Sequence, residues 1–182
     1  MTAMPTIDDA ATRHVARVAQ QAAWRLGHTW IGAEHLLFAA SAGLDRTGET
    51  LRAAGLTPRP VWRLIEQLVG VGRWAVDRDA LAAIGIDVDE VLSAAGMPSG
   101  IAPMRGSGRR PRRHRHLPLN AVATRCLLAA ATPGGSSASM TSTAAVARAV
   151  IHDDSRTVEL LLQRCHVDRP GLSQALHRIA RR

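Results

Sequence analysis

Residues 24–40 read WRLGHTWIGAEHLLFAA, and this stretch decides how the chain folds. The segment before it, 10–26, repeats apolar residues every three or four positions, which predicts an amphipathic helix. Gly27 is placed to end that helix, because glycine readily adopts the left-handed conformation found after a helix C-terminus. The apolar run that follows predicts a second helix over 33–42. The stretch therefore predicts two helices joined by a short turn.

Two more helices are expected downstream, over 46–54 and 60–69. Gly55 and Gly70 follow them as terminators, and Pro60 suits the first turn of the fourth helix. Ala, Leu and Val are abundant, aromatic residues make up only 3% of the chain, and no alternating strand pattern occurs in this part. The predicted fold class is all-α.

The chain also repeats itself at a nearly constant offset, which predicts two copies of one four-helix unit. Three matches occur in the same order, two of them at an offset of 156 − 46 = 110 and one at 123 − 11 = 112. The matching pairs are Ala11-Thr12-Arg13 with Ala123-Thr124-Arg125, Arg46-Thr47-Gly48-Glu49 with Arg156-Thr157-Val158-Glu159, and Arg59-Pro60 with Arg169-Pro170.

A helical insertion and a linker are expected between the copies. The insertion contains DRDALAAIGIDVDEV, which predicts a short helix, a turn at Gly85 and another helix capped by Asp87. The linker combines Pro, Gly and Ser with a dense Arg/His run, and we expect it to be exposed. The predicted organisation is repeat 1 at 8–70, the insertion at 71–96, the linker at 97–116 and a degenerate repeat 2 at 117–182.

The stretch Leu26-Gly27-His28, followed by Ile31-Gly32-Ala33-Glu34-His35-Leu36-Leu37, closely resembles the hallmark motif of the Clp/Hsp100 N-terminal domain. The resemblance is strong over 10–70. Over 117–182 it is degenerate but in register. It implies two four-helix repeats related by a pseudo-twofold axis. It also implies a stand-alone, non-catalytic module that binds a degron, an adaptor, a phosphoarginine or a cyclic peptide, and that acts as an adaptor or decoy for a Clp unfoldase or protease.

The same resemblance implies a set of ligand-binding residues. Glu34 matches the acid that receives the guanidinium of phosphoarginine, whereas Ala144 stands where the second repeat should carry its own. Thr143 keeps the threonine that precedes this acid. Ile7 and Leu119 match positions that floor an apolar groove. Trp30 is added for its own position rather than for the resemblance, because a tryptophan in the interhelix loop is expected at the surface, where it can anchor a partner. The expected binding residues are Glu34, Ile7, Leu119, Thr143 and Trp30.

Glu34 has two interpretations that the sequence leaves open. A carboxylate in the first turn of a helix is stabilised by the helix dipole, and the amides beside it can receive a phosphate. That combination suits phosphoarginine. The same residue type is also common at helix N-termini without any ligand.

No catalytic or metal motif accompanies these residues. The chain contains no Lys, so it cannot carry the P-loop lysine of an ATPase. His28, Glu34 and His35 do not form an HExxH motif, because position 39 is Ala39. We therefore expect no enzyme activity, no cofactor and no metal.

Basic residues suggest an alternative function. The chain has a net charge of +8, and all 23 basic residues are arginine. An Arg/His run can bind nucleic acid through its phosphates, or it can be a solvated linker, since no aromatic residue lies within it to stack on bases. The residues concerned are Arg109, Arg110, Arg112, Arg113 and Arg115, within 105–116.

The cellular location is predicted from two absences. Cys126 and Cys165 are isolated, which fits free thiols in a reducing compartment. The sequence has no run of 18 apolar residues. We expect a cytoplasmic protein with no membrane contact.

Overall fold

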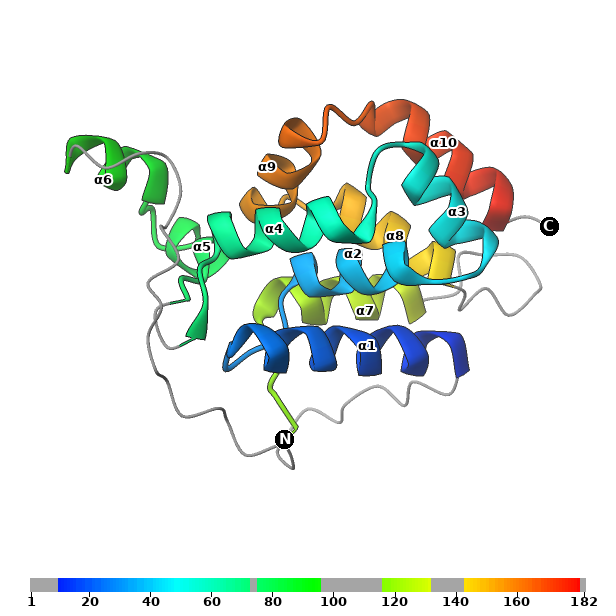
Figure 1. Ribbon diagram of the computed structural model, residues 1–182, viewed down its shortest axis with the longest axis horizontal. Coiled ribbons are helices and arrows are strands. Elements are labelled where there is room, and N and C mark those ends of the chain that lie inside the picture. The colour runs from blue at the N-terminus through cyan, green and yellow to red at the C-terminus, as the bar shows by residue number, and fades with distance from the viewer. Residues whose placement is uncertain (1–9, 73–74, 96–115, 132–142, 181–182) are drawn as a thin grey trace.

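The computed structural model describes residues 10–72, 75–95, 116–131 and 143–180, and these residues are all-helical, as the sequence predicts. Among them no strand occurs, and an isolated bridge joins Ile31 to Leu119. Figure 1 shows the arrangement. The helices of the described part are α1 (Ala10–Leu26), α2 (Ala33–Ala42), α3 (Arg46–Ala53), α4 (Pro58–Leu68), α5 (Arg78–Ala82), α6 (Val88–Ala94), α7 (Ala121–Ala131), α8 (Thr143–His152), α9 (Arg156–Arg164) and α10 (Arg169–Ala180).

The turn after α1 needs glycine for two reasons. Gly27 has a φ of +76°, in the left-handed region that side chains disfavour. A Cβ at this position would also lie 2.8 Å from the Cα of Gly72. The predicted end of the first helix is thus confirmed, and the turn is held against the segment after α4.

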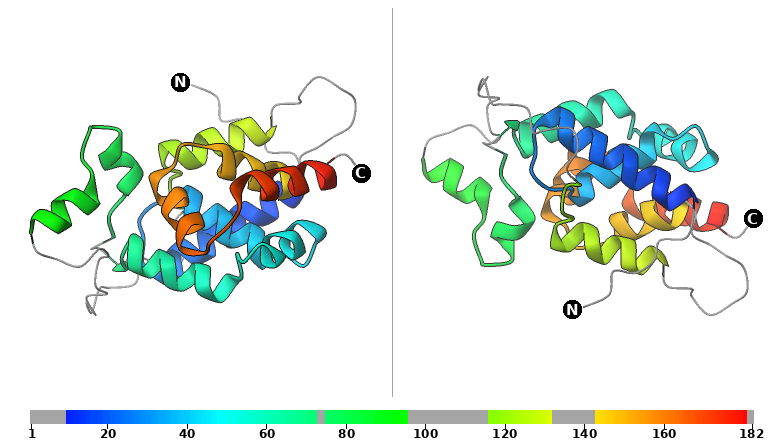
Figure 2. Two further views of the ribbon diagram at one scale, coloured as in Figure 1. Left: turned by 90° about the horizontal axis from the view of Figure 1, so that it is seen from above. Right: turned by 90° about the horizontal axis from the view of Figure 1, so that it is seen from below.

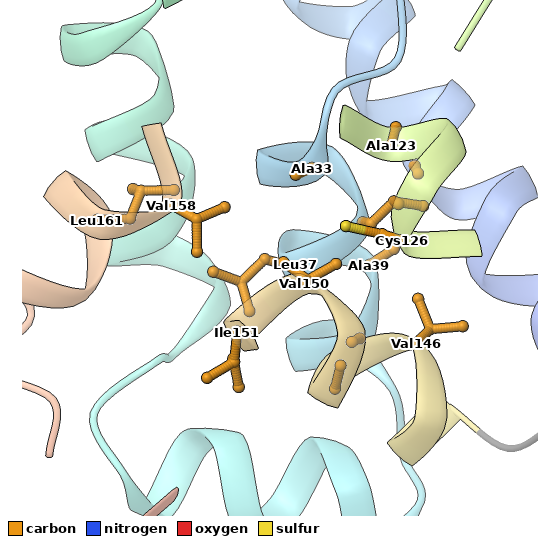
Figure 3. Close-up of a cluster of buried hydrophobic side chains, with 14 of the residues drawn as sticks. Ala33, Leu37, Ala39, Ala123, Cys126, Val146, Val150, Ile151, Val158 and Leu161 are labelled. Atoms are coloured by element: carbon orange, nitrogen blue, oxygen red, sulfur yellow. The ribbon is translucent and has the colours of Figure 1, made fainter. Parts of the chain in front are cut away.

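Helix α2 lies at the centre of the molecule. Eight of its ten residues are buried, five of them apolar, as expected of a helix that other helices surround. It packs against α1, α3, α4, α7, α8 and α9. Figure 3 shows Leu37 of α2 close to Val150 and Ile151 of α8, in the middle of the apolar core.

Helices from the two ends of the chain alternate around α2 and α8. Helix α1 packs on α2 and α7 packs on α8, while α3 packs on α10 and α4 packs on α9. The views in Figure 2 show the two sets of helices interleaved around one core. Neither half of the sequence therefore buries its apolar faces by itself.

The fourth helix starts two residues earlier than the sequence predicts. Leu56 N donates to Leu51 O at 2.9 Å, which closes the end of α3, and Thr57 is extended. The helical conformation then begins at Pro58, so Pro58 rather than Pro60 occupies the first helical position. This is a local correction to the predicted range of 60–69.

Helices α5 and α6 form a hairpin that projects from the rest of the molecule (Figures 1 and 2). Gly85 turns the chain with a φ of +82°, and Asp87 Oδ1 accepts from the Asp89 amide at 2.8 Å to cap α6. Both features are as predicted. Helix α5 packs on α9, whereas α6 has no buried residue.

None of the helices in the described part of the chain combines the length and the apolar character needed to cross a membrane.

Candidate functional site

Three of the predicted site residues, Trp30, Glu34 and Leu119, lie at one junction. The segment that contains Trp30 and Ile31 runs parallel to the segment that contains Leu119, just before α7. Ile31 N donates to Pro118 O at 2.8 Å, and Asn120 N donates to Ile31 O at 3.0 Å. We call residues 30–34 and 117–120 the seam.

Asn120 anchors the seam to two other elements. Its Oδ1 accepts from the Ala123 amide at 2.9 Å, so Asn120 caps α7. Its Nδ2 donates to Asp77 Oδ2 at 3.1 Å, which ties the seam to the start of the hairpin. Trp30 and Leu119 are half-buried, so both offer apolar surface along this junction.

Two buried histidines, His28 and His35, contact the seam from inside the protein. His28 Nε2 lies 2.9 Å from the carbonyl oxygen of Gly70, so this nitrogen is the donor. His28 Nδ1 then accepts from His35 Nε2 at 2.9 Å. Trp30 stacks on the His28 ring, with centroids 5.5 Å apart and planes 17° from parallel. Burial is the main cause that lowers the pKa of His28 from 6.5 to about 4, so the ring is neutral at pH 7.

Glu34 lies inside the protein, with only 2% of its surface exposed. Its Oε1 is 3.0 Å from His35 Nδ1, the same nitrogen that lies 3.0 Å from the Gly32 amide. The two contacts are alternatives: an unprotonated Nδ1 accepts from Gly32, and a protonated one donates to Glu34. Burial opposes ionisation of Glu34, but the His35 ring and the Glu34 amide outweigh it and lower the pKa of this carboxyl group.

His28, Glu34 and His35 place potential ligand atoms within 4.8 Å of one another. They form a line, however, rather than a shell around one point. His35 is in the middle, with His28 at its Nε2 and Glu34 at its Nδ1. A single ion can bind only one of those two nitrogens, and so could not take all three residues without rearrangement.

Thr143 and Ala144, which the sequence repeat predicts to correspond to Ala33 and Glu34, are buried as well. Thr143 is 8% exposed and begins α8, and Ala144 is fully buried. Ala33 and Glu34 are their partners at an offset of 143 − 33 = 110. The first residues of α2 and of α8 therefore both face inward, and Ala144 suits that environment without a charge to satisfy.

The remaining predicted site residues cannot be placed. Ile7 and the basic run Arg109, Arg110, Arg112, Arg113 and Arg115 lie outside the described residues.

The two cysteines lie in apolar surroundings. Burial raises the pKa of the Cys126 thiol to about 12 and also raises the pKa of Cys165. Both thiols are therefore protonated at neutral pH, and the thiolate is the nucleophilic form.

Asp79 was not identified from the sequence. It is nearly buried in α5, where its two carboxylate oxygens accept from Ser155 Oγ at 2.9 Å and from the Thr157 amide at 3.2 Å. Burial raises its pKa. It thus fixes the hairpin to the start of α9. The residues in these contacts lie more than seventy positions apart, so local spacing in the sequence gives no signal for them. The sequence shows only that an acid lies within DRDALAA.

The amino-acid sequence matches no protein-family model, and no curated protein matches it. The resemblance of 24–40 to the Clp N-terminal motif therefore stays a prediction.

Proposed function

We propose that this chain is a non-catalytic, Clp N-domain-like module that binds peptide segments of other proteins, and that its two halves are twofold-related repeats. The seam carries this proposal, because it joins the connection between α1 and α2 to the segment just before α7. Trp30 and Leu119 lie on these two neighbouring segments, and both are only half-buried. Apolar side chains on a hydrogen-bonded seam suit capture of a peptide rather than chemistry.

Equivalent helix boundaries support the repeat. Helices α2 and α8 begin 143 − 33 = 110 residues apart, and so do α3 and α9 at 156 − 46 = 110. The N-caps of α3 and α9 also correspond. Asp45 accepts from the Gly48 amide at 2.9 Å, and Ser155 accepts from the Val158 amide at 3.1 Å.

The contacts between the halves support the twofold relation. Helices α2 and α8 meet at the centre, and the other cross-contacts come in reciprocal pairs. Helix α3 packs on α10 as α9 packs on α4, and α1 packs on α8 as α7 packs on α2. Reciprocal pairs of this kind are expected when a twofold axis passes between two copies.

Arginine clamps at two helix ends add a third line of support. Arg52 donates to the carbonyl oxygens of Ser41 and Gly43, which end α2. Arg169 donates to those of Ile151 and Asp153, which end α8, again 110 residues later. The two arginines come from different helices, but they neutralise the same helix terminus in each half.

The test measures binding of an array of peptides from cytosolic proteins, half of them treated with phosphatase, to the full chain. Substituting Leu119→Asp should weaken the peptides that bind, because it places a charge at the apolar seam. The matched control is Leu44→Asp, at an exposed leucine between α2 and α3. Equal affinities for the two variants, or an array without any binder, would contradict the proposal.

Phosphoarginine forms a separate arm of the same experiment. If it is the ligand, Glu34→Gln should weaken binding of phosphoarginine peptides and phosphatase should abolish it. Because Glu34 is buried, thermal unfolding of the variant must be measured in parallel. If Glu34→Gln leaves the affinity for phosphoarginine peptides unchanged, Glu34 is not part of the ligand site.

The Arg/His composition of 105–116 supports a second candidate, binding of nucleic acid. Affinity for duplex DNA should then fall steeply with rising salt, and deletion of 105–116 should abolish both the affinity and its salt dependence. Absence of DNA binding at low salt would exclude this function.

A further inference from the structure

A shallow aromatic groove lies between α2 and α4, away from the seam. We infer that it binds an acidic peptide segment of a partner protein, with one apolar side chain of that segment seated in the groove. The inference shares with the proposed function only the kind of ligand, since none of the groove residues belongs to the seam. The groove has a volume of about 420 Å³ and is lined by Phe38, Pro58, Arg59, Trp62, Arg63 and Glu66.

The groove concentrates aromatic residues in a chain that has few of them. The sequence contains one Phe, four Trp and no Tyr, and two of these five side chains meet here. Phe38 and Trp62 pack edge to face, with centroids 5.2 Å apart and planes at 65°. Both are half-buried, so each keeps apolar surface exposed. Partly exposed aromatic side chains in a hollow are common anchors of protein interfaces.

The walls of the groove are held in place before any ligand arrives. Trp62 Nε1 donates to Glu66 Oε1 at 2.9 Å, one turn further along α4. Pro58 occupies the first helical position, where its ring restricts the backbone. A preformed site loses little conformational entropy on binding, which favours affinity.

The charges around the groove select an acidic ligand. Arg59 and Arg63 are exposed and lie one turn apart on the same face of α4. Neither forms an ion pair with any residue that the structure describes. The one acid of the groove, Glu66, already accepts from Trp62. The surface that remains for a ligand is therefore aromatic and cationic, and arginine pairs well with carboxylates.

The ring geometry favours a peptide side chain over a nucleobase. Single-stranded nucleic acid binds proteins by stacking its bases on open aromatic faces. Here the edge of one ring packs against the face of the other, which makes a corner rather than an open platform. A corner suits a branched or aromatic side chain.

The experiment uses the full-length chain and the fluorescent peptide acetyl-Glu-Asp-Leu-Phe-Asp-Glu-amide, with binding followed by anisotropy. Two control peptides replace Leu-Phe by Ser-Ser, or replace all four acids by Lys. The groove variant is Arg59→Glu with Arg63→Glu. Its matched control is Arg25→Glu with Arg46→Glu, which changes the net charge equally at two exposed arginines outside the groove.

We expect the acidic apolar peptide to bind, and the groove variant to weaken it by at least about tenfold while the control variant changes it little. Both control peptides should bind much more weakly, and rising salt should weaken the acidic peptide. Trp62→Ala should also abolish binding; if that variant unfolds, the arginine pair decides, since both of its side chains are exposed.

Four results would overturn the inference. They are equal loss in the groove and control variants, equal binding of the Ser-Ser peptide, displacement of the peptide by a single-stranded oligonucleotide, and no binding at all. Loss of binding in Leu119→Asp with none in the groove variant would assign the peptide to the seam instead, and so separates this inference from the proposed function.

Discussion

His28 makes the molecule sensitive to acid at the scale of one residue. Its ring is fully buried and donates to the Gly70 carbonyl 42 residues away, so the folded protein holds it neutral. The pKa is about 4 in the folded protein against 6.5 ordinarily, because burial disfavours the charged ring. In the unfolded chain the same ring binds a proton below pH 6.5, and protons therefore favour unfolding.

The expected result is a loss of stability as pH falls from 6.5 to 4. The contribution of His28 is fully present above pH 6.5, declines through this window and levels off below it. The difference between the two pKa values corresponds to about 3 kcal/mol in the free energy of unfolding. Urea denaturation at several pH values measures it. His28→Gln should flatten the pH dependence, and the matched control is His14→Gln, at an exposed histidine of α1.

At the scale of elements, helix ends are where sequence and structure agree best. Gly27, Gly55 and Gly70 all have positive φ and lie where the sequence predicts helices to end. The reason is local: a left-handed residue after a helix depends only on its own side chain and its neighbours. The start of α4 was predicted two residues late because two prolines compete for the same first turn, and only the closure of α3 by Leu56 decides between them.

The projecting hairpin depends on one arginine more than on its own apolar residues. Arg78 is buried; its Nε donates to Leu68 O at 2.6 Å and its Nη1 donates to Asp89 Oδ1 at 3.0 Å. Ile84 and Val91 are by contrast 72% and 55% exposed. A helix as short as α6 is marginal in water without tertiary contacts. The polar contacts of Arg78 therefore connect α6 to the rest of the protein.

Arg78→Met should loosen the hairpin without unfolding the core. Amide hydrogen exchange should accelerate over 78–94, while α2 and α8 keep their protection, because one lost bond joins the hairpin to α4 and the other joins α5 to α6. The control is Arg125→Met, which removes an exposed ion pair with Asp153 that contributes little. Unchanged exchange over 78–94 would mean that packing of α5 on α9 suffices.

At the scale of the whole molecule, the two halves share one apolar core, so we expect them to unfold as one cooperative unit. Leu37 of α2 and Val150 of α8 are fully buried in the same cluster (Figure 3). Removal of either side chain leaves a cavity that both halves border. Leu37→Ala should lower the free energy of unfolding by about 2–5 kcal/mol, and Val150→Ala should lower it by less.

Tryptophan fluorescence tests this cooperativity, because all four tryptophans lie within residues 24–74. Val150→Ala, in the second half, should still shift the urea midpoint recorded by fluorescence, and that midpoint should agree with the one from circular dichroism. A fluorescence midpoint that Val150→Ala leaves in place would show that the halves unfold independently.

The sequence matches that predict a repeat agree only partly with the helix starts. Helix α3 has eight residues and α9 has nine, so the offset rises from 110 at their starts to 169 − 58 = 111 at the starts of α4 and α10. The match of Arg59-Pro60 with Arg169-Pro170 therefore falls one residue out of step with the helices. Similar sequence letters recur by chance in an arginine-rich chain, whereas helix starts are placed by packing.

The sequence by itself determined the all-α class, the approximate helices and the residues that end them, because helix formation and termination depend on residues within a turn or two of each other. Only the tertiary structure decided that Glu34 faces inward, that Ile31 pairs with Leu119 and that Phe38 meets Trp62 in a groove. Those outcomes depend on which helix faces bury one another, and that choice is made between surfaces that lie tens of residues apart in the chain.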